Sequence, residues 1–427
     1  MKKRNSPETE FGSRTLIYSM LVSAYFFSYF FRVSSSVSLP IIAGEWGMSA
    51  SLVGLISSLY FYAYAFMQPV SGALNDRFGP MKVVSLGMAT SGVGALVFAF
   101  APTPFVLGIG RLLTGLGLAP MLSGVLVFQS HSFPVDRYSF YSGITYTVGN
   151  LGAVVSVAPL AFALDEFGRK NVFVLLSLMN FLLAVMLISR RREDPVANIN
   201  TMGNRSSFVE NLKSSFKKIG HSTQLKLMLV LWGVSFGALM SLQGLWAVSW
   251  YQVSYGISHG SASAWSTLIS VGVMLGNFAG AYIARPSRYR RIAIVSSCLS
   301  YGLAWCIFWI SMRSRLPIAL PGVMGFILGV SAGISYDHLT AGVNDLSARE
   351  YGGSLFGGMN LFTFISVIAF QWGTGAFLQF FSTGSVGIYD PGAYSKTFGI
   401  VTFMVIMSLL ALPFLKSFEN GKGSKLI

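Results

Sequence analysis

The sequence predicts an all-α integral membrane protein with about twelve transmembrane helices. Apolar residues make up 53% of the 427 residues, and only 11% of the side chains are charged. Soluble domains carry about 25% charged residues, so this composition indicates a membrane protein. The mean hydropathy of +0.61 agrees. The apolar residues also form long runs separated by short polar turns, and about 20 such residues cross a bilayer as a helix.

The runs that are long enough to span a bilayer fall into two sets. The first set is Thr15–Leu39, Ser51–Leu74, Met81–Phe100, Pro104–Phe128, Tyr138–Leu164 and Val172–Ile188. The second set is Leu225–Val253, Ala262–Ala284, Ile292–Ser311, Pro317–Val343, Gly352–Phe381 and Ala393–Leu415. We expect a cytoplasmic N-terminus (1–14), a six-helix bundle (15–189), a cytoplasmic linker (190–224), a second six-helix bundle (225–415) and a cytoplasmic C-terminus (416–427). Within the linker we expect an amphipathic surface helix around Ser206–Ile219.

The net charge of +15 does not indicate nucleic-acid binding, because the basic residues crowd into short turns and the two ends. With both termini in the cytoplasm, the outer face keeps only Arg169, Lys170, Arg313, Arg315 and Lys396. The inner face then collects the remaining basic turns and the linker, as the positive-inside rule requires. We therefore expect a multi-pass protein of the cytoplasmic (inner) membrane with cytoplasmic termini.

A short charged turn, Ser71–Lys82, separates the second and third apolar runs. It contains Gly72, Leu74, Asp76, Arg77, Gly79 and Lys82. This order resembles the loop between the second and third helices of the major facilitator superfamily, roughly G-x-L-x-D-R-x-G-x-x-x-K/R, with the lysine one place earlier. The resemblance implies a gate in which glycine lets two helices approach and Asp76 pairs with Arg77.

The second half repeats this pattern in weaker form. Gly280–Arg285 aligns with Gly72–Arg77, and Ala284 stands where Asp76 does. Arg349 closes a segment that parallels Asp136-Arg137 of the first half. A parallel repeat of two pseudo-symmetric six-helix bundles is the major facilitator fold, and it adds Arg285 and Arg349 to the gate candidates.

Charged groups inside the predicted spans are few, and each costs at least about 2.5–3.5 kcal/mol to insert. Arg32 lies about seven residues, or ~11 Å, from the outer end of its span at Leu39. Arg111 lies at a similar depth in the fourth span. Two guanidinium groups facing one cavity repel each other unless an anion lies between them. We expect an anion site here; alternatively, Arg111 caps backbone carbonyls and braces the bundle.

The first two spans resemble the organophosphate/phosphate antiporter branch of the superfamily, through Tyr29-Phe-Phe-Arg-Val33 and Leu59–Gln68. In that branch the first-helix arginine is half of a phosphate clamp, which implies this role for Arg32. The second clamp arginine falls near Leu242–Gln243, and Gln68 replaces an expected lysine. A monoanion, or an ester held by fewer charges, is therefore as compatible with these residues as a doubly charged phosphate ester.

Neutral polar residues suggest the rest of the pathway. Tyr64 and Gln68 share one face of the second span, and Tyr146 and Gln243 lie in the fifth and seventh spans. We expect these four residues to bind substrate with Arg32 and Arg111.

The tenth span carries an acid beside a histidine. Asp337 and His338 suit proton coupling, because both side chains exchange protons. The alternative is a cap at the cytoplasmic end of the helix or a gate contact to Arg349.

These residues predict a secondary active transporter that moves a small organic anion, a carboxylate or a phosphate ester, by alternating access with proton symport or exchange. Efflux of amphiphilic compounds or drugs is an alternative, and a non-transporting membrane sensor a remote one. The expected partners are the organic anion, protons or a counter-anion, and the lipid bilayer. We expect no binding of nucleic acid and a monomeric protein. No enzyme is expected, because no catalytic motif is present. Neither a cofactor nor a metal is expected, and Cys298 and Cys306 fall in one apolar run.

Overall fold

The computed structural model describes residues 7–134, 137–196, 216–283, 289–314, 316–346, 352–382 and 389–416. Within these ranges the chain is almost entirely helical and has no strand. Eleven helical stretches of the described chain are long and apolar enough to cross a membrane. The shorter α7 (Tyr138–Val155) crosses the bundle beside α1 and completes the predicted set. The all-α membrane fold is confirmed.

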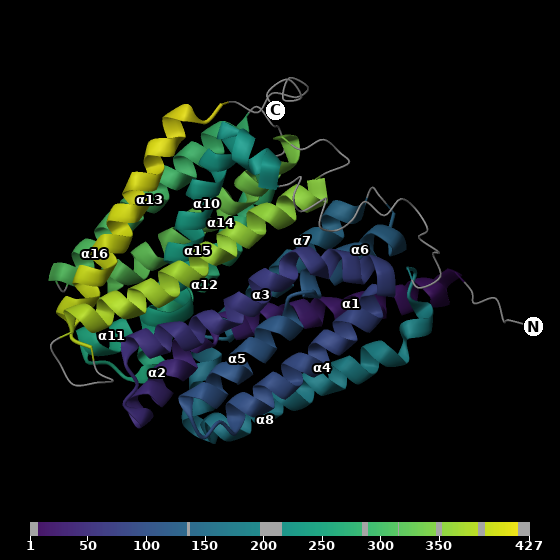
Figure 1. Cartoon of the computed structure of the whole chain (residues 1–427), viewed down its shortest axis with the longest axis horizontal. Helices are drawn as coiled ribbons and strands as arrows, with labels where there is room; N and C mark the ends of the chain where they lie inside the picture. Colours follow the sequence, from purple (N-terminus) through teal and green to yellow (C-terminus); the bar gives the residue numbers. More distant parts are fainter. Residues whose placement is uncertain are drawn as a thin grey trace, which may run out of the picture.

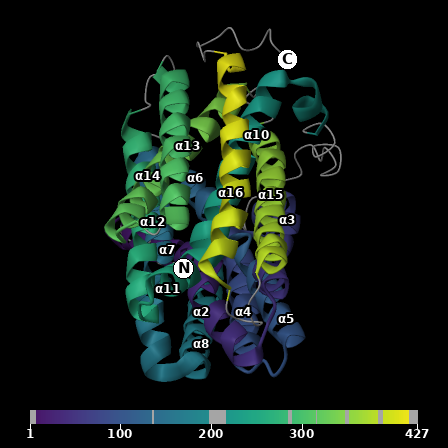
Figure 2. The same ribbon diagram turned by 90° about the vertical axis from the view of Figure 1, so that its left-hand side faces the viewer.

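The helices form two sets that follow each other along the chain (Figure 1). The first set, coloured purple to teal, is α1 (Pro7–Val33), α2 (Ser35–Trp46), α3 (Ala50–Phe78), α4 (Pro80–Ala99), α5 (Pro104–Leu118), α6 (Met121–Ser132), α7 and α8 (Ala158–Ser189), followed by the short η2 (Arg191–Glu193). The second set, teal to yellow, is α10 (Thr223–Ser241), η3 (Leu242–Trp246), α11 (Ala247–Tyr255), α12 (His259–Ile283), α13 (Arg290–Ser314), α14 (Ala319–Leu346), α15 (Gly352–Phe381), α16 (Pro391–Ser408) and η5 (Leu409–Phe414). Figure 2 shows α13 and α16 side by side on the face of the second set nearest the viewer.

Several predicted spans are interrupted rather than continuous. The first breaks at Ser34 and continues to Trp46, so the predicted outer end at Leu39 is wrong and Arg32 lies deeper than expected. The fourth breaks before α6 at Pro120, which lacks the N–H needed to continue the helical ladder. The seventh contains the π-helical turn η3, a distortion that recurs at functional sites.

The turn between the second and third spans is much shorter than predicted. α3 continues through Phe78 and α4 begins at Pro80, so the expected turn Ser71–Lys82 is wrong in extent. Gly79 alone makes the reversal, with φ of 82°, a conformation that side chains other than glycine rarely adopt. Asp76 and Arg77 therefore lie in the last turn of α3 and not in a loop.

The predicted division between the fifth span (Tyr138–Leu164) and the sixth (Val172–Ile188) falls at a bend inside α8. α8 contains a non-helical residue, Gly168, with φ of 73°. The fifth traverse therefore consists of α7 and the first part of α8, and the sixth begins after Gly168. Of the predicted surface helix Ser206–Ile219, the described part is helical over 216–221, and residues 206–215 lie outside the described ranges.

The two sets touch closely at one end of the molecule. A Cβ on Gly54 of α3 would lie 2.6 Å from the carbonyl oxygen of Gln371 in α15, and one on Gly375 would lie 2.5 Å from that of Ala50. The backbone N–H of Ala158 also donates to Thr267 Oγ1 in α12 at 3.1 Å. We call this the closed end.

At the opposite end, where α1 begins and η5 ends, the same helices lie further apart. Cβ atoms added to Gly72 in α3, Gly143 in α7 and Gly357 in α15 would meet no atom within 4 Å. We call this the open end.

Candidate functional site

A cavity of about 260 Å³ lies between the two sets of helices. The first set contributes Tyr25, Tyr29, Arg32, Tyr64, Gln68, Leu122 and Tyr146. The second contributes Trp232, Phe236, Asn277, Tyr336, Asp337, Thr340, Ala341, Asn360, Thr363 and Phe364. The lining is thus mainly aromatic, with amides and hydroxyls, one arginine and one carboxyl group.

Arg32 is the one cationic side chain among the described residues that line this cavity. It lies in the last turn of α1, just before the break at Ser34, and its residue is 5% exposed. Its Cζ lies 4.5 Å from the ring centroid of Tyr29, 5.0 Å from that of Tyr64 and 5.6 Å from that of Phe364. Within the described residues its guanidinium forms no hydrogen bond or ion pair, and its buried Nε has no partner. The ring faces stabilise the cation, but they leave its charge uncompensated.

Arg111 does not line the cavity. Its residue is 3% exposed, and its guanidinium donates to the carbonyl oxygen of Phe31 at 2.7 Å, to Ser35 Oγ at 3.2 Å and to the carbonyl oxygen of Ser57 at 3.4 Å. Its Cζ also lies 5.0 Å from the ring centroid of Tyr60. The structure therefore does not bring the two predicted arginines together: Arg111 spans the break between α1 and α2 and holds it against α3.

The neighbours Asp337 and His338 face different surroundings. Asp337 lines the cavity from α14, and among the described residues it has no ion-pair partner. A Cβ on Gly280 would lie 2.8 Å from Asp337 Oδ2, so the glycine in α12 leaves room for the carboxyl group. His338 is 0% exposed and does not line the cavity. Arg349, the predicted gate contact, lies outside the described residues.

Three of the predicted pathway residues, Tyr64, Gln68 and Tyr146, line the cavity. Gln243 does not: it is 2% exposed within η3, and its Nε2 donates to Ser270 Oγ at 2.8 Å. The π-helical turn directs this side chain into the packing between α12 and η3.

Sequence reasoning missed several lining residues. Tyr25 and Tyr29 are spaced by four residues, and Arg32 follows three residues later, so all three share one face of α1. That spacing was sufficient to add both tyrosines to the predicted site. Phe364 offered no such signal, because only the packing of α15 on α3 brings its ring over Arg32.

Two of the predicted gate residues, Arg77 and Lys82, lie over the ring of Phe78. Arg77 Cζ lies 5.0 Å and Lys82 Nζ 5.5 Å from its ring centroid, and within the described residues Asp76 and Arg77 form no ion pair. A Cβ added to Gly72 would meet no atom within 4 Å, and Arg285 lies outside the described residues.

An acid that sequence reasoning missed holds the turn at Gly79. Asp194 is 3% exposed, and its Oδ2 accepts a hydrogen bond from the backbone N–H of Met81 at 2.9 Å. A Cβ on Gly79 would lie 2.5 Å from the same oxygen. Glycine is therefore required at the turn both for its positive φ and for the close approach of Asp194.

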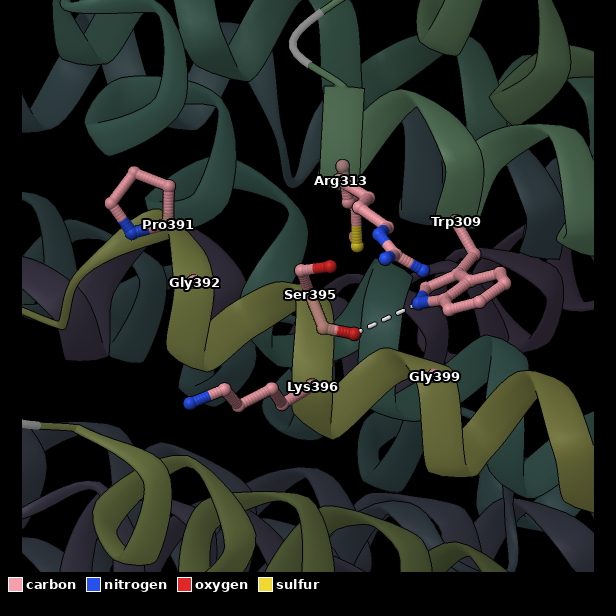
Figure 3. A pocket seen from close by; sticks show the side chains of 8 residues that line it. Trp309, Arg313, Pro391, Gly392, Ser395, Lys396 and Gly399 are labelled. Atoms are coloured by element: carbon pink, nitrogen blue, oxygen red, sulfur yellow. Dashed lines mark hydrogen bonds between the residues drawn. The ribbon is translucent and has the colours of Figure 1, made fainter.

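A second cavity, of about 510 Å³, lies between α13 and α16 on the periphery (Figure 3). Trp309 Nε1 donates to the carbonyl oxygen of Ser395 at 2.9 Å, and Arg313 and Lys396 line the same space. Neither α13 nor α16 lines the central cavity. This pocket is therefore separate from the candidate site.

Comparison with known proteins identifies related sequences. The profile of the Major Facilitator Superfamily matches residues 21–371. A probable sulfoacetate transporter, SauU of Cupriavidus necator, is 29% identical over 38% of this chain and 38% of its own length. The uncharacterized transporter YybO of Bacillus subtilis is 22% identical over 75% and 77%. A probable hexose phosphate transport protein of Chlamydia trachomatis is 26% identical over 42% and 39%. The chain thus spans less than half the length of the first and third of these proteins.

Solved structures share the fold. A bacterial homolog of the human lysosomal transporter Spinster, in an inward-facing and occupied conformation, aligns with a TM-score of 0.72 and 14% identity over 97% of both chains. A D-xylose–proton symporter aligns with a TM-score of 0.74 and 12% identity over 96% of this chain and 98% of its own.

Proposed function

The chain belongs to the Major Facilitator Superfamily, and from this premise we propose that it is a secondary transporter that carries a small organic anion by alternating access. The observation that supports the substrate class is Arg32, a buried guanidinium that lines the central cavity and has no counter-charge beside it among the described residues. A buried charge is costly unless it is paired, and a bound carboxylate, sulfonate or phosphate oxygen would pair it with charge-assisted hydrogen bonds.

The size of the anionic charge follows from the number of cations. Arg111 uses its guanidinium on the backbone and on Ser35, outside the cavity. Among the described residues, a substrate in the cavity therefore meets one guanidinium, which favours a single negative charge over a phosphate dianion. Relatives named as probable sulfoacetate and hexose phosphate transporters support an anionic substrate.

Asp337 provides a coupling mechanism. It reaches the cavity from the second set of helices while Arg32 reaches it from the first. An ionised carboxylate in the same cavity repels an anionic substrate, and protonation of Asp337 removes this repulsion. Anion and proton then enter together, as in symport. His338, which lies outside the cavity lining, takes no part in this step.

The two ends of the molecule fit one step of alternating access. We place the protein in the cytoplasmic membrane with both termini in the cytoplasm. The open end, where α1 begins, then faces the cytoplasm. In one protein molecule the two six-helix bundles, 15–189 and 225–415, then part at the closed end as they approach each other at the open end. Asp76, Arg77 and Lys82 act at this inner gate.

Uptake into proteoliposomes tests the substrate class. Reconstituted protein is given radiolabelled sulfoacetate, a hexuronate and a hexose phosphate, with and without an inward proton gradient. We expect saturable, gradient-driven uptake of at least one of the three, with the hexuronate, the one monoanion among them, favoured over the two dianions. Arg32→Gln should reduce binding by about 30-fold or more, since truncating one partner of a buried charge pair costs about 2–5 kcal/mol. Unchanged uptake of every anion by this variant would refute the anion assignment.

The coupling role has its own readout. Asp337→Asn mimics the protonated carboxyl group, so it should retain anion exchange between the two sides of the vesicle but lose the response to the proton gradient. Gradient-driven accumulation that survives in Asp337→Asn would remove Asp337 from the coupling mechanism.

The aromatic lining supports a second candidate, efflux of amphiphilic compounds. Trp232, Phe236 and Phe364 present large apolar faces to the cavity. If this is the function, Arg32→Gln should leave transport unchanged and Phe364→Ala should reduce it. The same uptake assay with a fluorescent amphiphile separates the two functions.

A further inference from the structure

One ion pair connects the two sets of helices in the part of the chain that the structure describes. At the closed end, His259 at the start of α12 places Nδ1 3.2 Å from Asp165 Oδ1 in α8. The same imidazole places Nε2 3.3 Å from the carbonyl oxygen of Val37 in α2. The side chain of His259 is 13% exposed and that of Asp165 is 51% exposed. One ring thus bridges two helices of the first set from the second.

The nature of these partners decides how many N–H groups the ring needs to make both contacts as hydrogen bonds. A carboxylate oxygen and a backbone carbonyl oxygen are both acceptors, so each needs a donor. Neutral imidazole has one N–H and one acceptor nitrogen, whereas imidazolium has two N–H groups. Both contacts are hydrogen bonds together only when His259 carries two protons.

From this geometry we propose that His259 is a proton-dependent latch of the closed end, which holds the two sets of helices together when protonated and releases them when it loses its proton. The proton leaves to water at the closed end as the ring separates from Val37 and Asp165. The latch relies on the alternating-access part of the proposed function and not on the identity of the substrate.

Other charged groups near the latch are engaged elsewhere or face solvent. On α8, Arg169 Cζ lies 5.2 Å from the ring centroid of Trp46 in α2, and Lys170 Nζ lies 4.8 Å from that of Phe100. Glu166 on α8 and Glu45 on α2 are exposed. The described titratable side chains of α11, which packs on α12 and α2, are Tyr251 and Tyr255, and the hydroxyl of Tyr255 donates to the carbonyl oxygen of Leu316 at 2.7 Å. Asp165 is therefore the charged group that faces the ring.

The direction of the pH effect follows from linkage. Both contacts across the closed end are hydrogen bonds only while the ring carries two N–H groups, and loss of one proton leaves one acceptor without its donor. By reciprocity, protonation favours closure of this end and a rise in pH favours its opening.

Cysteine accessibility tests the latch in the full-length protein. Ser263 lies one helical turn after His259, is 0% exposed, and precedes Thr267, which accepts the cross-bundle bond from Ala158. In a background with Cys298→Ser and Cys306→Ser, a Ser263→Cys reporter in nanodiscs reacts with a membrane-impermeant maleimide only when the closed end opens. The exposed Ser314→Cys in the same background corrects for the pH dependence of the thiol reaction itself.

We expect the corrected alkylation rate of the reporter to rise about two- to fivefold from about pH 5.5 to 8, the size expected when a partly exposed ion pair is lost. His259→Gln and Asp165→Asn should each react at the faster rate throughout and show a flat pH profile. The matched control His131→Gln, on the exposed surface of α6, should keep the wild-type profile.

Two results would overturn the proposal in different ways. A pH response that persists in His259→Gln, with normal opening, would remove the latch and leave alternating access intact. A reporter that stays unreactive at every pH, while Ser314→Cys reacts, would show that the closed end does not open. That result would overturn alternating access and the latch together, whatever anion the cavity binds.

Discussion

Replacing Arg111 should damage the stability of the protein and leave its anion site intact. The guanidinium makes three hydrogen bonds, at 2.7, 3.2 and 3.4 Å, to groups on both sides of the break at Ser34 and on α3. A hydrogen bond from a charged donor contributes about 1.5–3 kcal/mol, with the long bonds near the lower limit. Loss of the buried cation also removes its own desolvation cost, so we expect a net loss of about 3 kcal/mol in Arg111→Met.

This loss should appear in the melting temperature and not in the binding constant. A destabilisation of about 3 kcal/mol lowers the melting temperature of a large domain by roughly 10 °C. Because Arg111 lies outside the cavity lining, the Kd of the transported anion should change by less than about threefold. Thermal unfolding in detergent with and without the anion measures both quantities on one sample.

Arg32→Met is the matched control, since it removes the other buried arginine of the first bundle. It should lose ligand-induced stabilisation, while its unliganded melting temperature falls little or rises, because the guanidinium has no described hydrogen bond to lose. Arg111→Lys keeps the charge but not the fork of donors, and it should recover only part of the stability. If Arg111→Met melts like the wild type yet no longer binds the anion, Arg111 is a ligand and the assignment as a brace is wrong.

Two further changes test close contacts within the first set of helices, one at the Gly79 turn and one between α3 and α5. Asp194→Ala removes the acceptor of the Met81 N–H and should lower the free energy of unfolding by about 0.5–2 kcal/mol, as loss of a helix N-cap does. Proteolysis at the Gly79 turn should increase. An unchanged melting temperature and cleavage pattern would contradict the anchoring role of Asp194. Gly115→Ala brings a Cβ against the carbonyl oxygen of Tyr60 and should cost about 1–3 kcal/mol through overpacking. The Cβ of Gly72→Ala would meet no atom within 4 Å, so this variant should be neutral or slightly stabilising. Equal melting temperatures for the two variants would argue against the close approach of α3 and α5.

The spans could be predicted because their signal is local. α4 and α15 begin and end within a residue of the predicted runs, since a bilayer-length apolar stretch needs no information about its neighbours. Breaks inside spans were not predicted at Ser34 and in η3, because they depend on side chains of other helices. Ser35 Oγ, for example, donates to the carbonyl oxygen of Gly244 in η3 at 3.1 Å.

The candidate site was predicted in part for the same reason. The rarity of charges inside apolar runs was enough to select Arg32, Arg111, Asp337 and His338. The composition alone did not predict which of these four side chains faces the cavity. Adjacent helical residues point about 100° apart, so Asp337 faces the cavity and His338 does not.

By itself, the sequence determined that this chain crosses a membrane many times as two related halves, that it belongs among transporters, and that a few buried charges matter. Only the tertiary structure decided which of two similar arginines is left uncompensated. Arg111 finds backbone carbonyls at the break in the first span, whereas Arg32 meets the faces of aromatic rings. The physical reason is that hydrogen bonding of a buried charge depends on the rotation and packing of several helices, and no single helix carries that information.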